Sequence, residues 1–233
     1  MKVLNLFLVT LLWATKMCFG QSQPQAQAGL DIGVGVNEMG WSPSVLYHEE
    51  VGLSRISWLQ GVIGIRTWGL YAGSSDLKFQ NQSVNQQILK YQNLSANGLS
   101  LVAGINIQIS KVDLGANTDF FGVVYGSARS AFYPGSPAVP GEGAAYYNTR
   151  ISTSPTVLNT LPLFFHRQTG QSEIYARIRI ARSIGLKVGY LYGRISYATR
   201  DIDDKKVILD YGQQRFSKTY GMPYAALCYS FSD

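Results

Sequence analysis

The chain has 233 residues, a formal net charge of +6, 46% hydrophobic residues and only 15% charged residues. This length fits one β-domain, and the basic residues are spread out, without the basic-aromatic clusters of a nucleic-acid groove. The only cysteines are Cys18 and Cys228, so loss of the first with a leader peptide leaves no intrachain disulfide. These features exclude a disulfide-built fold and argue against a nucleic-acid partner.

The amino terminus predicts export. Lys2 precedes an apolar run over residues 3–14, which is too short for a spanning helix but typical of a secretory signal. Cys18 follows Thr15-Lys16-Met17, a poor lipobox, so lipidation is not expected. Cleavage after Gly20 makes residues 1–20 a signal peptide and residues 21–233 one mature β-barrel domain. After this segment no stretch reaches the roughly 18 apolar residues of a spanning helix.

The rest of the chain alternates apolar with polar or small residues, the pattern of strands with one apolar and one polar face. Strands are predicted over residues 28–36, 45–58, 62–72, 97–110, 114–126, 172–181, 185–198 and 216–231. Residues 97–110 exceed the usual soluble strand length of about 5–6 residues. They match the roughly 9–11 tilted residues that cross a membrane.

The connections between these strands alternate in length. Short turns are predicted at 59–61, 110–113 and 182–184, and long irregular segments join the other strands. Up-and-down barrels with short periplasmic turns and long external loops have this asymmetry, whereas a soluble Greek-key sandwich has no reason for it. We therefore predict an all-β fold, an eight-stranded antiparallel up-and-down transmembrane β-barrel in a bacterial outer membrane.

Strand register predicts a polar network in the lumen. Pairing Ile180 with Leu186 places Arg179 beside Lys187 inside the barrel, where like charges need a carboxylate nearby. Asp119, on the adjacent predicted strand, is the candidate.

The same reasoning pairs Ile109 with Leu114 and brings Asn106 next to Asn117. The predicted lumen network consists of Asp119, Arg177, Arg179, Lys187, Asn106 and Asn117, with Glu173 nearer the outer rim. Because an eight-stranded barrel is just wide enough for side chains to fill, we expect this network to close the lumen. The alternative is that it lines a narrow channel.

Two segments resemble a known family. LGANTDFFGVVYG, preceded by GINIQIS, resembles the paired motif of small outer-membrane β-barrel proteins of the Bacteroidota, and the tail RFSKTYGMPYAALCYSF is similar to their closing strand. Leu227, Tyr229 and Phe231 resemble the carboxy-terminal signal read by the barrel assembly machinery, although Ser232 and Asp233 follow. The resemblance implies a Gram-negative outer-membrane location, with membrane lipid and the assembly machinery as partners. It implies no activity.

The predicted external loop over residues 127–171 is the best candidate for contact with an extracellular partner. Its aromatic residues include Tyr146, Tyr147, Phe164 and Phe165. Exposed apolar side chains on such a loop mark a partner surface, and the alternative is a lid over the barrel mouth. Both interpretations stay open.

Enzymatic chemistry has little support. The histidines are His48 and His166. A Ser–His–acid set drawn from Ser44, His48, Glu49 and Glu50 has proximity in sequence, but geometry is what defines a triad. No CxxC, HExxH or phosphate-cradling glycine-rich loop is present in the sequence, and we expect no cofactor. The leading hypothesis is a structural or loop-mediated interaction or adhesion protein. The alternatives are a narrow channel or carrier of small or apolar ligands, and an outer-membrane lipid-modifying enzyme.

Overall fold

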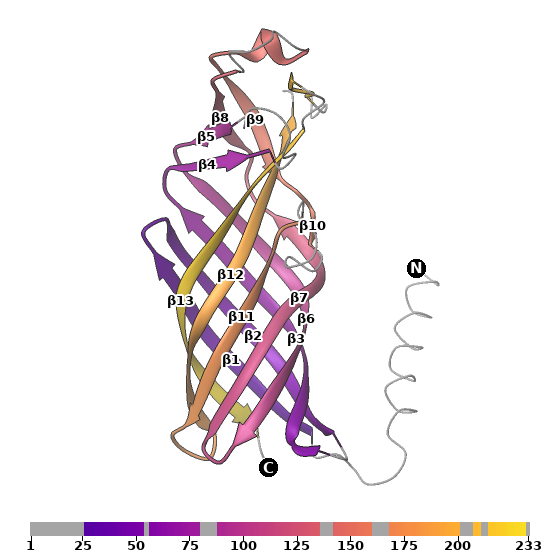
Figure 1. The fold of residues 1–233 in the computed structure, drawn as a ribbon, viewed down its shortest axis with the longest axis vertical. Coiled ribbons are helices and arrows are strands. Elements are labelled where there is room, and N and C mark those ends of the chain that lie inside the picture. Colours follow the sequence, from indigo (N-terminus) through magenta and orange to yellow (C-terminus); the bar gives the residue numbers. More distant parts are fainter. Residues whose placement is uncertain are drawn as a thin grey trace, which may run out of the picture.

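The computed structural model describes residues 26–53, 56–79, 88–135, 142–159, 168–200, 207–210 and 214–231. The predicted signal peptide, residues 1–20, lies outside these ranges, and its cleavage stays a prediction. Within them no helix has the length and apolar character needed to cross a membrane. The described residues form thirteen strands and one short 3-10 helix, and the strands make a single sheet (Figure 1). The predicted all-β class is confirmed.

The long strands close a ring, which we call the barrel. Each strand pairs antiparallel with the next, and the last returns to the first through the pair Ala28 and Phe231. In ring order the strands are β1 (Ala26–Asn37), β2 (Gly40–Leu53), β3 (Ile56–Ala72), β6 (Leu94–Ile109), β7 (Val112–Tyr125), β11 (Gly170–Arg179), β12 (Ile184–Arg200) and β13 (Arg215–Phe231). The short connections that follow β2, β6 and β11 lie together at the end of the barrel where β13 finishes (Figure 1).

Shorter strands build a second ring beyond the opposite end of the barrel. The shorter elements are β4 (Ser75–Lys78), β5 (Ile88–Tyr91), β8 (Arg129–Tyr133), β9 (Thr149–Pro155), β10 (Leu158–Asn159) and the 3-10 helix η1 (Glu142–Tyr146). β4, β5, β8 and β9 pair in this order and close on the far parts of β13 and β12. We call this second ring, with η1, the extension. β12 serves both rings because it has 17 residues: it pairs with β11 as far as Arg194 and with β9 from Tyr197.

The extension corrects the predicted strand count. The sequence predicts long irregular segments between the predicted strands 62–72 and 97–110 and over residues 127–171, but β4, β5, β8, β9 and β10 lie in them. A total of eight strands therefore does not describe the sheet as a whole. The added strands have two to seven residues, too few for a clear period-two pattern.

The structure also corrects one turn. The predicted turn at residues 59–61 lies inside β3, where Leu59 pairs with Ile107 and Gly61 pairs with Ile105 on β6. The chain reverses between Leu53 and Ile56 instead. A glycine occurs both in turns and in strands of a crowded barrel, so Gly61 alone does not locate the reversal.

Both predicted registers are wrong by two residues. Leu186 pairs with Ile178 and not with Ile180, and Leu114 pairs with Ile107 and not with Ile109. The β6–β7 connection spans residues 110–111 and is shorter than the predicted 110–113, whereas the β11–β12 connection spans residues 180–183 and begins earlier than the predicted 182–184. Because side chains alternate with a period of two, the shift leaves each residue on its predicted face.

A β-bulge in β7 reverses its outward positions. Leu101 pairs with Phe121 while Val102 pairs with Asp119, so Phe120 is the extra residue. Leu114, which precedes the bulge in the chain, faces outward, and Phe121 and Val123, which follow the bulge, also face outward.

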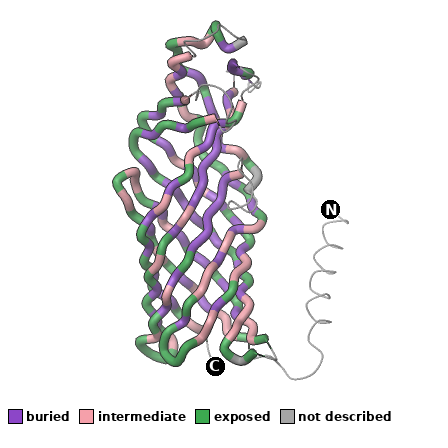
Figure 2. The backbone as a smooth tube through the Cα atoms, in the orientation of Figure 1, coloured by how far each residue is buried: buried purple, intermediate pink, exposed green. Residues whose placement is uncertain are grey.

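Buried and exposed residues alternate along the strands of the barrel and of the extension (Figure 2), but the two parts place apolar and polar side chains oppositely. In the barrel, apolar side chains are exposed on the outer face, as in Ile32, Ile63 and Ile174, while charged side chains are buried inside. In the extension the arrangement is reversed, because Leu77 and Leu89 are buried and the neighbouring polar residues are exposed. A water-soluble protein buries apolar surface; the extension follows that rule, whereas the outer wall of the barrel leaves its apolar side chains exposed.

Candidate functional site

The centre of the barrel holds a buried ammonium group between carboxylates. Lys187 Nζ on β12 lies 2.7 Å from Asp31 Oδ2 on β1 and 2.7 Å from Glu173 Oε1 on β11. Glu173 Oε1 also accepts a hydrogen bond of 2.9 Å from the side-chain amide of Asn117. A buried charge is stable only when it is paired and hydrogen-bonded, and these contacts supply both.

A second buried cation extends this cluster toward the extension. Arg66 on β3 lies 3.2 Å from Asp119 Oδ1 and 3.3 Å from Glu173 Oε1, measured from its terminal nitrogens. The other oxygen of Asp119 accepts a 3.0 Å hydrogen bond from the backbone N–H of Gln171. Glu173 is therefore shared by two cations, Lys187 and Arg66.

A second cluster lies nearer the short-loop end. Both terminal nitrogens of Arg177 donate to the two oxygens of Glu50, at 2.7 and 2.8 Å, and its Nε donates to Asp113 at 2.9 Å. Arg179 also binds Asp113 but is partly exposed at the rim. Asn106 donates to Glu50 at 3.3 Å. Bidentate arginine–carboxylate pairs of this kind are the strong form of the interaction.

The structure places the predicted lumen residues as follows. Asp119, Arg177, Lys187, Asn106 and Asn117 are buried in the barrel interior, as is Glu173, while Arg179 is only half-buried.

The predicted partners of these residues are wrong. Asp119 pairs with Arg66 and not with the predicted cations, and Glu173 lies at the centre of the network and not near the outer rim. Arg177, not Arg179, pairs in register with Lys187, because the register is shifted by two.

Sequence reasoning missed four charged members of the interior. These are Asp31, Glu50, Arg66 and Asp113. Asp31, Arg66 and Asp113 alternate with exposed apolar neighbours, as Asp31 does with Ile32, so the period-two pattern could have found them. Glu50 lacks this signal, because it follows the exposed Glu49. Counting charged residues on the polar faces of all the strands would have indicated a nearly balanced interior.

His48 belongs to this interior, where it lies next to Glu50 and not next to Glu49. It lies inside β2, and its Nε2 is 3.8 Å from both Asp31 Oδ1 and Glu50 Oε1. Glu49 points to the outer face, where it accepts a hydrogen bond from Tyr47, and Ser44 is hydrogen-bonded to Tyr224 at 3.1 Å. His166 lies outside the described residues. Among the described residues no group of three histidine, cysteine or acidic side chains is placed to hold a metal ion.

Apolar side chains cover the charged interior on the extension side. Trp68, Leu70, Leu191 and Met222 are buried there and belong to one cluster with the core of the extension. The indole N–H of Trp68 donates to Ser100 at 3.2 Å. From the short-loop end toward the extension, the interior of the barrel is therefore filled by ion pairs and then by packed apolar side chains.

Two of the aromatic residues predicted to contact a partner, Tyr146 and Tyr147, pack against other residues of the extension. Tyr146 and Tyr147 are half-buried and pack against the core of the extension. Tyr147 and Tyr133 both donate to Asp210 Oδ2, and the backbone N–H of Gly143 donates to Asp210 Oδ1 at 2.9 Å. Burial and the Asp210 carboxylate raise the pKa of Tyr133. Phe164 and Phe165 lie outside the described residues.

The predicted assembly signal lies on the outer face of β13. Leu227, Tyr229 and Phe231 are about half-exposed, and the rings of Tyr229 and Phe231 lie 5.1 Å apart in an edge-on contact. These residues lie on β13, which pairs with β12 on one side and β1 on the other and so closes the barrel. The role in assembly stays a prediction.

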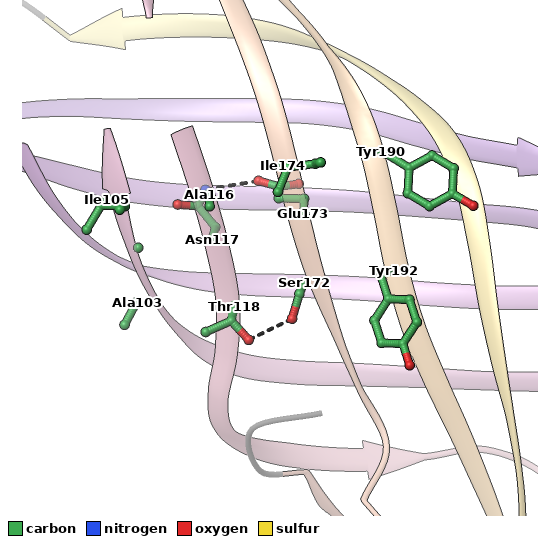
Figure 3. Close-up of a pocket in the computed structure, with 11 residues that line it drawn as sticks. Ala103, Ile105, Ala116, Asn117, Thr118, Ser172, Glu173, Ile174, Tyr190 and Tyr192 are labelled. Carbon is green, nitrogen blue, oxygen red and sulfur yellow. Dashed lines mark hydrogen bonds between the residues drawn. The ribbon is translucent and has the colours of Figure 1, made fainter. Parts of the chain in front are cut away.

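A groove of about 490 Å³ indents the barrel wall across β6, β7, β11 and β12 (Figure 3). Ala103, Gly104, Ala116, Asn117, Thr118, Ser172, Glu173, Ile105, Ile174, Tyr190 and Tyr192 line it. Within it the hydroxyl oxygens of Thr118 and Ser172 lie 2.7 Å apart. We call this feature the wall groove.

Comparisons with known proteins add little. No protein-family model matches the sequence, and no curated protein matches it. Among solved structures, the chain is similar to a major outer membrane protein from Thermus thermophilus. The two share 12% identity with a TM-score of 0.40, over 89% of this chain and 100% of the other. That likeness is too slight to bear on function, and the predicted Bacteroidota membership is not supported.

Proposed function

We propose that this chain is an integral outer-membrane β-barrel protein with a closed lumen, which anchors the extension as a surface for interaction. The observation that carries the proposal is the inverted polarity of the barrel. Leu227, Ile105 and Ile174 are more than half exposed, while Lys187 and Arg66 are 1% exposed inside. In water this arrangement is unfavourable on both faces, whereas a bilayer solvates the outer face and an ion-pair network satisfies the inner one.

Aromatic residues lie at both ends of the apolar outer face. Trp41 and Tyr71 stack with ring centroids 4.9 Å apart near the extension, and Trp58 and Phe231 lie on the strand segments at the short-loop end. Tryptophan and tyrosine concentrate at membrane–water interfaces. We infer that the barrel ring is an eight-stranded transmembrane barrel and that the extension stands in the outer aqueous phase.

Three further parts of the proposal rest on the sequence patterns described above. Export through a cleaved signal peptide precedes insertion, and the assembly machinery reads Leu227, Tyr229 and Phe231 on the last strand. The extension and the external segments contact an extracellular partner. The chain acts without enzymatic chemistry of its own, because His48 and Glu50 are buried in the charged interior and the Ser44 hydroxyl is hydrogen-bonded to Tyr224.

Tryptophan fluorescence tests the orientation of the barrel faces. We expect lipids brominated along their acyl chains to quench single-tryptophan variants that retain Trp58 or Trp41, which are about half exposed. A variant that retains only Trp68, 2% exposed in the interior, is the matched control and should be quenched weakly. Equal quenching of Trp58 and Trp68, or none at all, would overturn the membrane proposal.

Conductance tests the closed lumen. Because ion pairs and apolar side chains occupy the interior, the purified protein should show no stepwise current in planar bilayers. Regular conductance steps would contradict the closed lumen and favour the narrow-channel alternative, while leaving the barrel and its location in place.

A further inference from the structure

The wall groove combines a narrow apolar trough with a hydroxyl pair. Its floor carries the small side chains Ala103 and Ala116, and Ile105, Ile174 and Tyr190 rise around it as exposed side chains. Its volume of about 490 Å³ falls within the roughly 300–1,000 Å³ of small-molecule sites. Figure 3 shows Tyr190 and Tyr192 on β12, on the opposite side of β11 from Ala116 on β7 and Ala103 on β6.

We propose that the wall groove binds one acyl chain of a membrane phospholipid, with an ester carbonyl of that lipid at the hydroxyl pair of Thr118 and Ser172. The proposal rests on the proposed function, because the groove is continuous with the apolar outer face. In a bilayer that face contacts hydrocarbon, so the occupant must come from the membrane.

The hydroxyl pair gives the groove a polar end. Thr118 Oγ1 lies 2.7 Å from Ser172 Oγ and 3.4 Å from the carbonyl oxygen of Asp119. When Ser172 donates to Thr118, the Thr118 hydroxyl donates to the Asp119 carbonyl over a long 3.4 Å. When Thr118 donates to Ser172 instead, the hydrogen of the Ser172 hydroxyl is left to donate elsewhere. In hydrocarbon such a group is costly without an acceptor. An ester carbonyl supplies the acceptor, while the attached chain covers Ala103 and Ala116.

The shape of the groove favours a flexible chain over a second copy of the protein. Ile174 is 64% exposed and Ile105 55% exposed, so both project beside the floor at Ala116, with which both pair in register. A broad barrel wall would meet these projecting side chains before it reached the floor. A single acyl chain can lie between them.

Native mass spectrometry of the full protein, released from detergent after incubation with dipalmitoyl phosphatidylethanolamine, tests the proposal. We expect one retained lipid on the wild type. Ala116→Phe fills the floor and should reduce retention at least tenfold, whereas Val45→Phe, on the apolar outer face of β2, should retain the lipid. Thr118→Val keeps the side-chain volume but removes the hydroxyl, and should reduce retention about two- to tenfold.

The outcomes separate the possible failures. Equal retention by Ala116→Phe and Val45→Phe would overturn the groove proposal, and so would a dimer that only Ala116→Phe disrupts, because the face would then belong to a second copy. If Ala116→Phe does not fold, unchanged retention in Thr118→Val still overturns it. Quenching of Trp58 by brominated lipid alongside no retained lipid rejects the groove alone, whereas absent quenching rejects the membrane proposal.

Discussion

Lys187 Nζ lies 2.7 Å from Glu173 Oε1 on the adjacent strand β11 and reaches Asp31 on β1 at the same distance. β13 separates β12 from β1 in the ring, so this contact crosses part of the lumen. Arg177 on β11 likewise reaches Glu50 on β2. The network therefore ties together strands that share no backbone hydrogen bonds, and it fixes the cross-section of the barrel.

Replacement of Lys187 tests the importance of this contact. Lys187→Met keeps a long side chain but leaves Asp31 and Glu173 with less compensation in a buried site. Removing one partner of a buried pair costs about 3–5 kcal/mol. We expect a clear fall in the urea midpoint of the refolded protein in detergent, followed by its shift in electrophoretic mobility on unfolding.

Arg179→Met is the matched control for this substitution. Arg179 pairs with Asp113, but about a third of its side chain is exposed at the rim. An exposed pair contributes less than about 1 kcal/mol, so the midpoint should change little. Equal effects of Lys187→Met and Arg179→Met would contradict a buried network at the centre of the barrel.

Asp119 offers a test by charge reversal. Its carboxylate is fully buried, binds Arg66 at 3.2 Å and accepts the Gln171 backbone N–H. Asp119→Lys would place two cations together and leave that N–H without its acceptor, so folding in detergent should fail. Asp119→Asn keeps an acceptor and should fold with reduced heat stability. Unchanged heat stability in Asp119→Lys would show that the pair is dispensable.

A third prediction concerns Gly98, whose backbone lies close to the ring of Trp68. A Cβ added at Gly98 would lie 2.3 Å from the ring of Trp68, which is 2% exposed and packed in the core. Gly98→Ala should therefore lower stability by about 1–3 kcal/mol, as overpacking does.

Gly52→Ala is the control for that change. A Cβ at Gly52 meets nothing within 4 Å, and this residue also lies in a barrel strand. Its urea midpoint should stay close to that of the wild type. A similar loss in both variants would point to a general intolerance of alanine in the strands and not to the contact with Trp68.

The barrel could be predicted from sequence because its signal is repeated along every long strand. Glu173 and Arg177 alternate with Ile174 and Ile178, so the faces follow from a period of two. Pairing partners do not follow from this period, because a shift of two residues preserves both faces. For this reason the predicted face of Arg177 is correct while its predicted neighbours are wrong.

The extension could not be predicted, for a different reason. β4 and β5 have four residues each, and their stability comes from Leu77, Leu89 and Tyr91 packing into a shared core. Such contacts join segments far apart in the chain, such as Tyr91 and Tyr197, whose rings lie 5.4 Å apart. The wall groove likewise needs four strands in register, and no single strand indicates it.

The extension should lose stability in alkaline solution. Burial raises the pKa of Tyr197 to about 12 from its ordinary value of 10.0, and burial also raises the pKa of Tyr91. Between pH 10 and 12 the unfolded segment therefore loses its protons first, so the folded form becomes less stable as pH rises. The slope is roughly 1.4 kcal/mol per pH unit for each such tyrosine. Hydrogen exchange in β5, β8 and β9 measures this decline.

Tyr197→Phe identifies the contribution of one tyrosine to that decline. The variant loses the 2.6 Å hydrogen bond to the backbone oxygen of Ser95, so its extension should be about 1 kcal/mol less stable at neutral pH. Above pH 10 the variant has one titrating group fewer, and its stability should decline less steeply with pH than that of the wild type. Parallel declines in the two proteins would show that Tyr197 titrates alike in the folded and unfolded states and does not contribute to the alkaline transition.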